Sequence, residues 1–583
     1  PPPSERPPRR AARAAMAVGT AAVVKTGVAT LALWELCARG RLRGWALQLF
    51  VSLVRLYFHV PSFVADKYIY GWLKMKLGDF GREGRSLLTG LGLSRQGRAK
   101  LLKDRDALPK APRQPMAGIV TAVRTSESGR EWLKPLPDLT IEPGVPGGDA
   151  AIFLDPGVRY QTMLGFGGSF TEAAAHNISL LSEADQERVV KAYFHPTLGL
   201  GYTIGRLHMN SCDFSFGNWS CCERPGDQSL QGFSIDRYRP TLIPLMKRAE
   251  AAAGAPLRLL ASPWSPPAWM KTNGQMCQGG HLKAEHAKTW AEHYCLFAKH
   301  LEAEGLPLWG FTIQNEPEAN VRWESCLWNA EGERDFVRHC LGPSLAEHGL
   351  GHLKIIVWDH NRDRMYERAR VIYGDPEAAK YVWGLAFHWY GDPRYETWPD
   401  SAGGICYGNV QRVHDLRPDK HLVMTEGCQE LGAWLGRWWL AERYAENLVR
   451  DLNSWTEAYY DWNLALDEHG GPNHVGNTCS APMLIDKRTS KVFLQPSYYA
   501  IGHFSRYIRP GAQRILCASP RDALEVTAFI NPDDVIALVV LNQSDEAVDF
   551  CIQVAERPGG PGFARTSVPG HSITTYCLLA TPG

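Results

Sequence analysis

Residues 308–317 read LWGFTIQNEP, an apolar stretch typical of a β-strand that runs directly into the polar pair Asn315 and Glu316 and then a proline. The same layout, an apolar segment ending in a polar or aromatic cluster, occurs eight times. Helical patterns lie between the segments, for example at 183–194, 283–305 and 439–453. Eight alternations predict a (β/α)8 barrel, whose active site gathers at the carboxyl ends of its strands. The other segments are YQTMLGFGG (160–168), GYTIGRLHM (201–209), LRLLASPW (257–264), LKIIVWDH (353–360), VWGLAFHWY (382–390), HLVMTEG (421–427) and AYYDWNLAL (458–466).

The barrel rule selects the polar and aromatic residues at the strand ends, since these side chains should converge on one pocket. The set contains two glutamates, several indoles and several hydrogen-bonding groups. Aromatic faces stack on the C–H faces of a sugar, while carboxylates and amides bind its hydroxyls. We therefore expect a carbohydrate substrate. The selected residues are Arg206, Asp213, Trp264, Asn315, Glu316, Asp359, His360, His388, Trp389, Tyr390, Glu426, Trp462 and Asn463.

Two of these residues are candidate catalytic carboxylates. Glu316 lies in the NEP triplet, and Glu426 ends the apolar LVMTE segment. Glycosidic cleavage needs such a pair, one group to protonate the leaving oxygen and one to attack the anomeric carbon. A single glutamate among 61 acidic residues is usually a solvated surface group. Two glutamates at the ends of separate barrel strands favour the catalytic interpretation.

The tryptophans divide into two groups. Trp264, between prolines in SPWSPP, and Trp462, in DWN, are expected to line the pocket. Trp309, Trp358 and Trp383 precede their strand ends, and we expect them in the core, the ordinary place for an indole.

The charge distribution limits the possible partners. The net charge of +2 combines a basic segment, 1–115, which holds 21 Lys+Arg and 7 Asp+Glu, with an acidic remainder, 116–583, which holds 42 and 54. Nucleic-acid binding rests on clustered positive charge, so the acidic body argues against a nucleic-acid partner.

Several motifs of other enzyme classes are absent. The sequence has no GxSxG, HExxH, P-loop or CxxC zinc pair, and we expect neither a metal nor a cofactor. GFGGSF (165–170) lacks the GxGxxG spacing and is interpreted as a tight turn. HGLGH (348–352) contains two glycines, which favours a solvated loop over a helical metal site.

The basic segment 1–115 has the layout of a targeting or membrane-binding region. Arginines precede an apolar stretch at 17–34, and a second stretch at 44–65 contains Arg55. A signal anchor, a transit peptide, a peripheral amphipathic anchor and a simple extension all remain open. We interpret 80–115 as a basic linker. Three sequons, at Asn177, Asn218 and Asn542, would accept glycans only in a secretory lumen.

The strings SCDFSF, ASPWSPPAWMKTNG, QNEP, AFHWY, TEGC and DWNLALDEHGGPN resemble the glucosylceramidases of glycoside hydrolase family 30. The resemblance runs from about residue 160 to the C-terminus. It implies a barrel at 161–495 and a β-sandwich built from flanking segments, 116–160 and 496–583. The alternating strings LEVTAFI, VIALVVLNQS, VDFCIQV and SITTYCLLA fit the C-terminal part of that sandwich.

The resemblance also implies roles for individual residues. Glu316 matches the acid/base and Glu426 the nucleophile of a retaining double displacement, which predicts carboxyl groups about 5 to 5.5 Å apart. The charge around Glu426 is expected to raise the Glu316 pKa. The residues expected to hold or surround the glucosyl unit are Asp213, Trp264, Asn315, Trp462, Arg206, His388, Tyr390 and Asn477.

The implied substrate is glucosylceramide or a related glucosyl lipid, with a membrane surface and a lipid-presenting activator protein as partners. The implied location is a lysosomal or vacuolar lumen or a membrane, with secretion as the alternative. Other activities remain open, namely β-1,6-glucanase, β-xylosidase or a non-catalytic carbohydrate-binding barrel. Two features depart from the family pattern: 116–160 contains no cysteine, and TEGC replaces the more usual SEAC.

Overall fold

The computed structural model describes residues 100–102, 108–148, 150–395, 404–555 and 560–580. The apolar stretches 17–34 and 44–65 lie outside the described residues, so the interpretations of them stay predictions. In the described part of the chain, no helix combines the length and apolar character needed to span a membrane.

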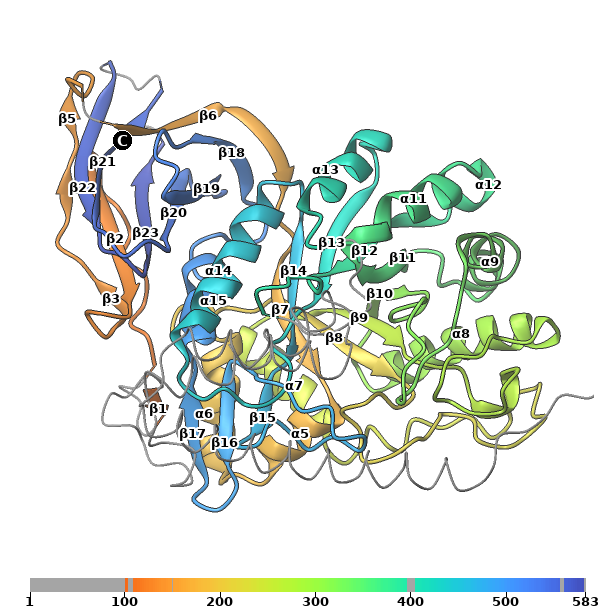
Figure 1. The fold of residues 1–583 in the computed structure, drawn as a ribbon. Coiled ribbons are helices and arrows are strands. Elements are labelled where there is room, and N and C mark those ends of the chain that lie inside the picture. Colours follow the sequence, from red (N-terminus) through yellow and green to blue (C-terminus); the bar gives the residue numbers. More distant parts are fainter. Residues whose placement is uncertain (1–99, 103–107, 149, 396–403, 556–559, 581–583) are drawn as a thin grey trace, which may run out of the picture. The chain divides into compact units, whose positions relative to one another are not determined.

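Eight parallel strands form a closed barrel, and each contains part of one predicted segment (Figure 1). The closing pair is parallel as well, with Ala458 opposite Gly165. This confirms the predicted (β/α)8 barrel. The strands are β7 (Gly165–Phe170), β8 (Ile204–Met209), β9 (Arg258–Pro263), β10 (Leu308–Thr312), β11 (Lys354–Asn361), β12 (Val382–His388), β13 (His421–Glu426) and β14 (Ala458–Asn463).

The predicted turn at 165–170 is wrong, because GFGGSF is strand β7, buried along its whole length. Its glycines allow close packing rather than a turn. A Cβ placed on Gly167 would lie 2.1 Å from the backbone oxygen of Ile204 on β8. HGLGH (348–352), in contrast, lies wholly outside helices and strands, as expected for a loop.

Helices follow the strands and surround the barrel (Figure 1). The pattern at 183–194 forms a helix with the predicted limits, begun by Ser182, whose hydroxyl accepts from the Asp185 amide. The longer pattern at 283–305 begins later, since 284–286 form a 3-10 turn. The helices are α5 (Glu172–Ser179), α6 (Glu183–Phe194), α7 (Leu242–Ala253), α8 (Ala287–Ala303), α9 (Ala330–Phe336), α10 (Gly342–Glu347), α11 (Met365–Tyr373), α12 (Pro376–Ala379), α13 (Tyr407–Leu416), α14 (Trp438–Leu452) and α15 (Pro496–Ser505).

Segments from both sides of the barrel build one large mixed sheet, as the family resemblance implies. In Figure 1, the orange strand β6 (Ala151–Thr162) lies among the blue C-terminal strands, and it pairs with both β18 and β21. A separate apolar cluster, which includes Ile152, Leu538 and Val540, forms the core of this sheet. Its other strands are β2 (Ile119–Ser126), β3 (Glu131–Pro135), β4 (Leu139–Thr140), β5 (Glu142–Pro143), β18 (Gln513–Ala518), β19 (Leu524–Ile530), β20 (Val535–Asn542), β21 (Val548–Val554), β22 (Gly562–Val568) and β23 (Ser572–Leu579).

The end of the predicted linker belongs to the folded body. β1 (Lys100–Leu102) pairs antiparallel with β17 (Lys491–Leu494), in a small sheet that also holds β16 (Met483–Asp486) and β15 (Ala465–Asp467). Further along, Arg113 forms an ion pair of 2.6 Å with Asp138. Residues 100–102 and Arg113 therefore contribute contacts to the body.

Burial separates the three sequons. The side-chain nitrogen of Asn177 donates to the Gly471 carbonyl, and that of Asn542 donates to the carbonyls of Glu546 and Pro569. Both residues are fully buried, whereas Asn218 is exposed. The Asn218 side-chain nitrogen also donates, to Glu324 Oε1 at 2.8 Å, so exposure alone favours Asn218 over the other two as a glycan acceptor in the folded protein.

Candidate active site

Arg206, on β8, is the centre of a buried hydrogen-bond network at the strand ends. It is fully buried and donates to Glu426 Oε2 at 2.6 Å, Asn315 Oδ1 at 2.8 Å and Asp359 Oδ2 at 3.0 Å. Its Nε donates to Ser262 on β9. The guanidinium thus links residues from four strand ends in fixed positions, which explains why an arginine is buried here.

Asp359 is a second centre, to which sequence analysis assigned no role. Its carboxylate accepts from Arg206, from His388 Nε2 at 3.0 Å, and from the hydroxyls of Thr312 and Thr425, both at 2.6 Å. Burial alone would raise the Asp359 pKa, but Arg206 and His388 outweigh it and lower the pKa below its ordinary value. Asp359 is therefore a permanent buried anion.

An irregularity in β11 aims two consecutive side chains at the site. The pairing of β11 with β12 shifts register between Trp358 and His360, and both Trp358 and Asp359 have positive φ, 75° and 57°. In a regular strand, consecutive side chains point to opposite faces. The bulge changes this alternation, so Asp359 reaches Arg206 while His360 faces Glu316.

Glu426, at the end of β13, is held through both carboxylate oxygens. Oε2 accepts from Arg206, and Oε1 accepts from the Tyr390 hydroxyl at 3.0 Å. Burial raises the Glu426 pKa, although the charges of His388 and Arg206 oppose this rise. Both oxygens of the predicted nucleophile thus have defined directions.

Glu316 follows β10 in a left-handed backbone conformation, with φ of 51° and its amide donating to the Asp359 carbonyl. Its Oε1 lies 3.2 Å from His388 Nδ1. Burial would raise the Glu316 pKa, but the hydrogen bond from His388 and the charges of His360 and His388 lower it. The prediction of a raised pKa is thus wrong. The reason is His388, whose pKa is raised to about 9: burial lowers it, but Glu426 and Asp359 outweigh that effect.

Trp264 and Trp462 stack on each other, with ring centroids 5.1 Å apart and an interplanar angle of 21°. The Arg206 guanidinium lies 4.8 Å from the first ring and 5.5 Å from the second. Gln314 fixes the loop by donating to the Trp264 carbonyl at 2.7 Å. The two indole rings therefore form an apolar surface beside the Arg206 guanidinium.

The other tryptophans lie where core packing predicts or close to it. Trp358 is buried, while Trp309 and Trp383 are half-buried and pack edge-to-face at 4.9 Å beside the barrel core.

Asp213 and Asn477 come from distant loops and meet directly. Asn477 Nδ2 donates to Asp213 Oδ2 at 2.9 Å, although the two residues are 264 positions apart in the sequence. Burial and the charge of Glu426 raise the Asp213 pKa well above its ordinary value. Such a carboxyl is suited to hydrogen bonding with neutral hydroxyl groups.

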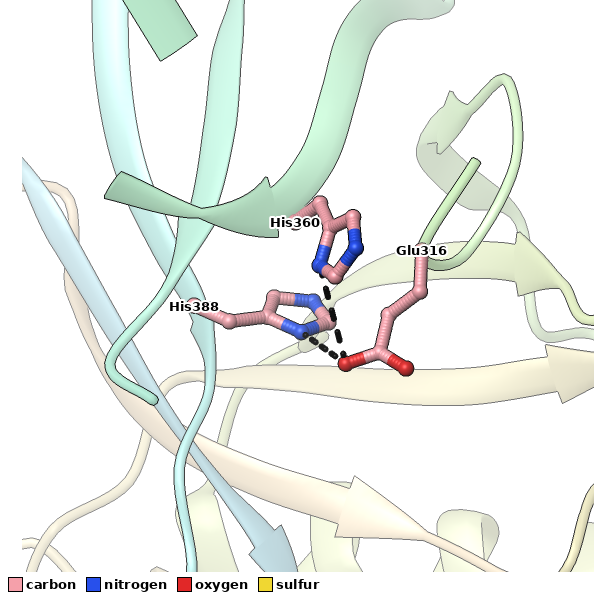
Figure 2. A group of neighbouring side chains, drawn as sticks. All are labelled: Glu316, His360 and His388. Atoms are coloured by element: carbon pink, nitrogen blue, oxygen red, sulfur yellow. Dashed lines mark hydrogen bonds and ion pairs between the residues drawn. The ribbon is translucent and has the colours of Figure 1, made fainter. Parts of the chain in front are cut away.

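Three potential metal ligands also converge, although the sequence contains no metal-binding motif. The donor atoms of Glu316, His360 and His388 all lie within 4.8 Å of one another, and Figure 2 shows both rings facing the carboxylate. They come from the ends of three neighbouring strands, β10, β11 and β12.

The side chains of Ser262, Thr312 and Thr425, which complete the network, were not singled out from the sequence. They lie inside apolar segments, and a hydroxyl within a predicted strand carries no sequence signal for function beyond its position near the carboxyl end.

Two family models match the chain, the glycosyl hydrolase family 30 TIM-barrel domain at residues 163–508 and the family 30 β-sandwich domain at 511–576. The lysosomal acid glucosylceramidase of Mus musculus is 36% identical over 441 residues, 73% of this chain and 82% of the mouse protein. Two solved structures each cover 79% of this chain and 99% of their own. SrfJ from Salmonella typhimurium has 31% identity and a TM-score of 0.73, and the endo-β1,6-glucanase BT3312 has 27% and 0.69. The chain therefore belongs to glycosyl hydrolase family 30, whose members are retaining glycoside hydrolases.

Proposed function

We propose that this enzyme hydrolyses the β-glucosyl bond of glucosylceramide or a closely related glucosyl lipid. The observation that carries the proposal is the different setting of the two glutamates. Glu426 is held through both oxygens by Arg206 and Tyr390, whereas Oε1 of Glu316 faces an imidazole that can exchange a proton with it. The similarity to mouse glucosylceramidase supports the choice of substrate.

In the first step, Glu426 attacks the anomeric carbon while Glu316 gives a proton to the aglycone oxygen. A carboxylate held by two donors presents a lone pair in a fixed direction, which favours in-line attack. Water then replaces the aglycone, and Glu316 takes its proton as the water attacks the glucosyl enzyme. Asp213, Asn477 and Asn315 bind the sugar hydroxyls, and the stacked indoles contact its apolar face.

The proton for the first step passes along the hydrogen bond between His388 and Glu316. The imidazole carries this proton before the reaction, since Glu426 and Asp359 raise the His388 pKa to about 9 despite burial. The 3.2 Å contact gives a direct route from Nδ1 to the carboxylate. Bound substrate displaces water from the pocket and favours the neutral carboxylic acid.

Paired variants test the assignment of the glutamates. We expect Glu426→Gln to abolish turnover of glucosylceramide and Glu316→Gln to lose activity mainly on substrates with poor leaving groups. Glu318→Gln is the matched control, because Glu318 lies two residues away and is paired with Arg364 and Arg368. Azide added to Glu426→Gly should yield a glycosyl azide of inverted configuration. Normal turnover by either Glu426 variant would overturn the nucleophile assignment.

A β-1,6-glucanase is the second candidate, because a solved endo-β1,6-glucanase covers the same 79% of the chain. Wild-type enzyme should be assayed with glucosylceramide and with short β-1,6-glucans under the same conditions. Faster hydrolysis of the glucans would reject the lipid substrate. Absence of hydrolysis with intact glycan binding would instead indicate a non-catalytic barrel.

The basic residues of segment 1–115 support membrane recruitment as part of this proposal, since anionic lipids attract Lys and Arg. A lumenal location and a lipid-presenting activator protein belong to the same hypothesis. The deletion that tests it should end at residue 96, because residues 100–102 pair with β17 in the body. Unchanged binding to anionic liposomes after this deletion would reject recruitment by the basic segment.

A further inference from the structure

The cluster of Glu316, His360 and His388 has the composition of a three-ligand metal site. Glu316 Oε1 lies 3.2 Å from His388 Nδ1 and 3.8 Å from His360 Nδ1. Ligands about 2.0–2.1 Å from a tetrahedral zinc ion are about 3.3–3.4 Å apart. Because the donor atoms lie within 4.8 Å of one another, small side-chain rotations bring all three into that range.

His388 has the support that a metal-binding histidine requires. Its Nε2 lies 3.0 Å from Asp359 Oδ1, and that carboxylate is itself fixed by Arg206 and two threonine hydroxyls. A carboxylate on one ring nitrogen keeps a proton on that nitrogen, and a cation then binds the other nitrogen in place of the proton it carries. Nδ1, the nitrogen that faces Glu316, is therefore the ligand atom.

His360 supplies a donor that has no other partner. Its Nδ1 is buried and makes no hydrogen bond among the described residues, yet it points toward the Glu316 carboxylate (Figure 2). The side chains of His360 and Glu316 are 16% and 17% exposed, whereas that of His388 is fully buried. A cation can therefore enter from the open side and keep a water molecule as its fourth ligand.

The charge around the cluster favours a cation. Three carboxylates, from Glu316, Asp359 and Glu426, lie in the network, against two cations, Arg206 and the protonated His388, and a bound cation replaces the His388 proton. Two imidazoles with one carboxylate suit Zn²⁺ or Cu²⁺, while Mg²⁺ and Ca²⁺ prefer all-oxygen sites.

We propose that Glu316, His360 and His388 form a binding site for a divalent transition-metal cation such as Zn²⁺, and that its occupancy inhibits the enzyme. The bound ion takes the lone pairs of Glu316 and His388, so the carboxyl group cannot carry a proton. The inhibitory part rests on the proposed role of Glu316 as acid/base, while the binding part rests on the three donors alone. Removal of the metal by a chelator restores activity.

The test uses the full chain after treatment with a chelator, followed by calorimetric titration with ZnCl2. We expect one saturable site, at least a tenfold loss of affinity in His360→Ala, and no response to Mg²⁺. His348→Ala is the matched control, because His348 also pairs with a glutamate, Glu292, but lies outside the site. Equal affinity of wild type and His360→Ala, or weakening only by His348→Ala, would overturn the proposal.

A second measurement works if His360→Ala does not fold. Pulsed EPR of Cu²⁺ bound to the wild type should show coupling to two imidazoles, and a spectrum without two imidazoles would overturn the site.

Zn²⁺ inhibition of hydrolysis should weaken in a folded His360→Ala variant by the same factor as Zn²⁺ binding. Zn²⁺ binding with two imidazole ligands but no inhibition would support the site and reject the acid/base role of Glu316.

Discussion

Replacing Asp359 with asparagine tests whether the buried anion organises the site. The substitution keeps the size of the side chain but removes its charge and converts one acceptor oxygen into a donor NH2 group. Four donors point at this carboxylate, from Arg206, His388, Thr312 and Thr425. The remaining amide oxygen can accept two of them, so at least two donors face a group that cannot accept.

The expected loss of stability follows from the number of hydrogen bonds that the substitution removes. A hydrogen bond to a charged group contributes about 1.5–3 kcal/mol, so two lost bonds reduce the free energy of unfolding by about 3–6 kcal/mol. Most of the site network also loses its fixed geometry, because Arg206 and His388 position Glu426 and Glu316. A loss of about 3–4 kcal/mol in transition-state stabilisation corresponds to a reduction of roughly 10²–10³-fold in kcat/KM.

The assay combines urea unfolding with hydrolysis of glucosylceramide at 25 °C, where the variant is still folded. Thr425→Val is the comparison, since it removes one donor to the same carboxylate and should cost about 1.5–3 kcal/mol, half the loss expected for Asp359→Asn, with a small effect on kcat. An Asp359→Asn enzyme with wild-type stability and activity would refute the claim that this anion holds the network together.

Three further predictions concern parts of the protein outside the network. Gly167→Ala should lower the free energy of unfolding, measured in urea, by about 3 kcal/mol, since its Cβ would lie 2.1 Å from the Ile204 oxygen. Gly147→Ala is the control: Gly147 has open space around it, so this change should alter the free energy of unfolding by less than about 0.5 kcal/mol. Glu131→Gln should cost about 2 kcal/mol at neutral pH, because hydrogen bonds from Arg124, and also Lys134 and Ser126, lower the Glu131 pKa to about 2. This stabilisation is present above the ordinary pKa of 4.5 and lost as pH falls toward 2, so unfolding curves of wild type and variant should converge in acid, and a constant difference would contradict the assignment. In cells that direct the chain to the secretory lumen, Asn218→Gln should remove the endoglycosidase-sensitive mobility shift that arises from the sequons at Asn177, Asn218 and Asn542. A shift that depends on the buried Asn177 would show that glycans attach before folding.

The barrel was predictable because its signal is repeated. Each of the eight segments has an apolar strand and a polar end, so an error in one would not have changed the fold class. The same rule directed attention to Arg206, Asn315 and Glu426, which the structure brings into one hydrogen-bond network. Their catalytic or binding roles stay proposals.

Other features could not be read from local sequence. GFGGSF looks like a turn because glycine ordinarily favours turns, but β7 needs glycine to approach β8 closely, a requirement that depends on the neighbouring strand. The Glu316 pKa was predicted in the wrong direction because the effect of Glu426 was considered without that of His388. The protonation of Glu316 and Glu426 depends on His388, which lies on a different strand, β12.

The bulge in β11 connects the catalytic proposal with the metal site. Two non-glycine residues at positive φ cost roughly 1–3 kcal/mol each, so other contacts must hold the backbone there. Two interactions do so: the Trp358 amide donates to the buried Glu333 carboxylate at 2.8 Å, and the Asp359 carbonyl accepts from the Glu316 amide at 2.9 Å. The second bond ties the conformation of the bulge to that of Glu316. Regular alternation in β11 would turn either Asp359 or His360 away from the site, and would thereby remove either the anion that orients His388 or the third metal ligand. The bulge in β11 thus permits both the proposed proton route and the proposed cation site, and the two compete for Oε1 of Glu316.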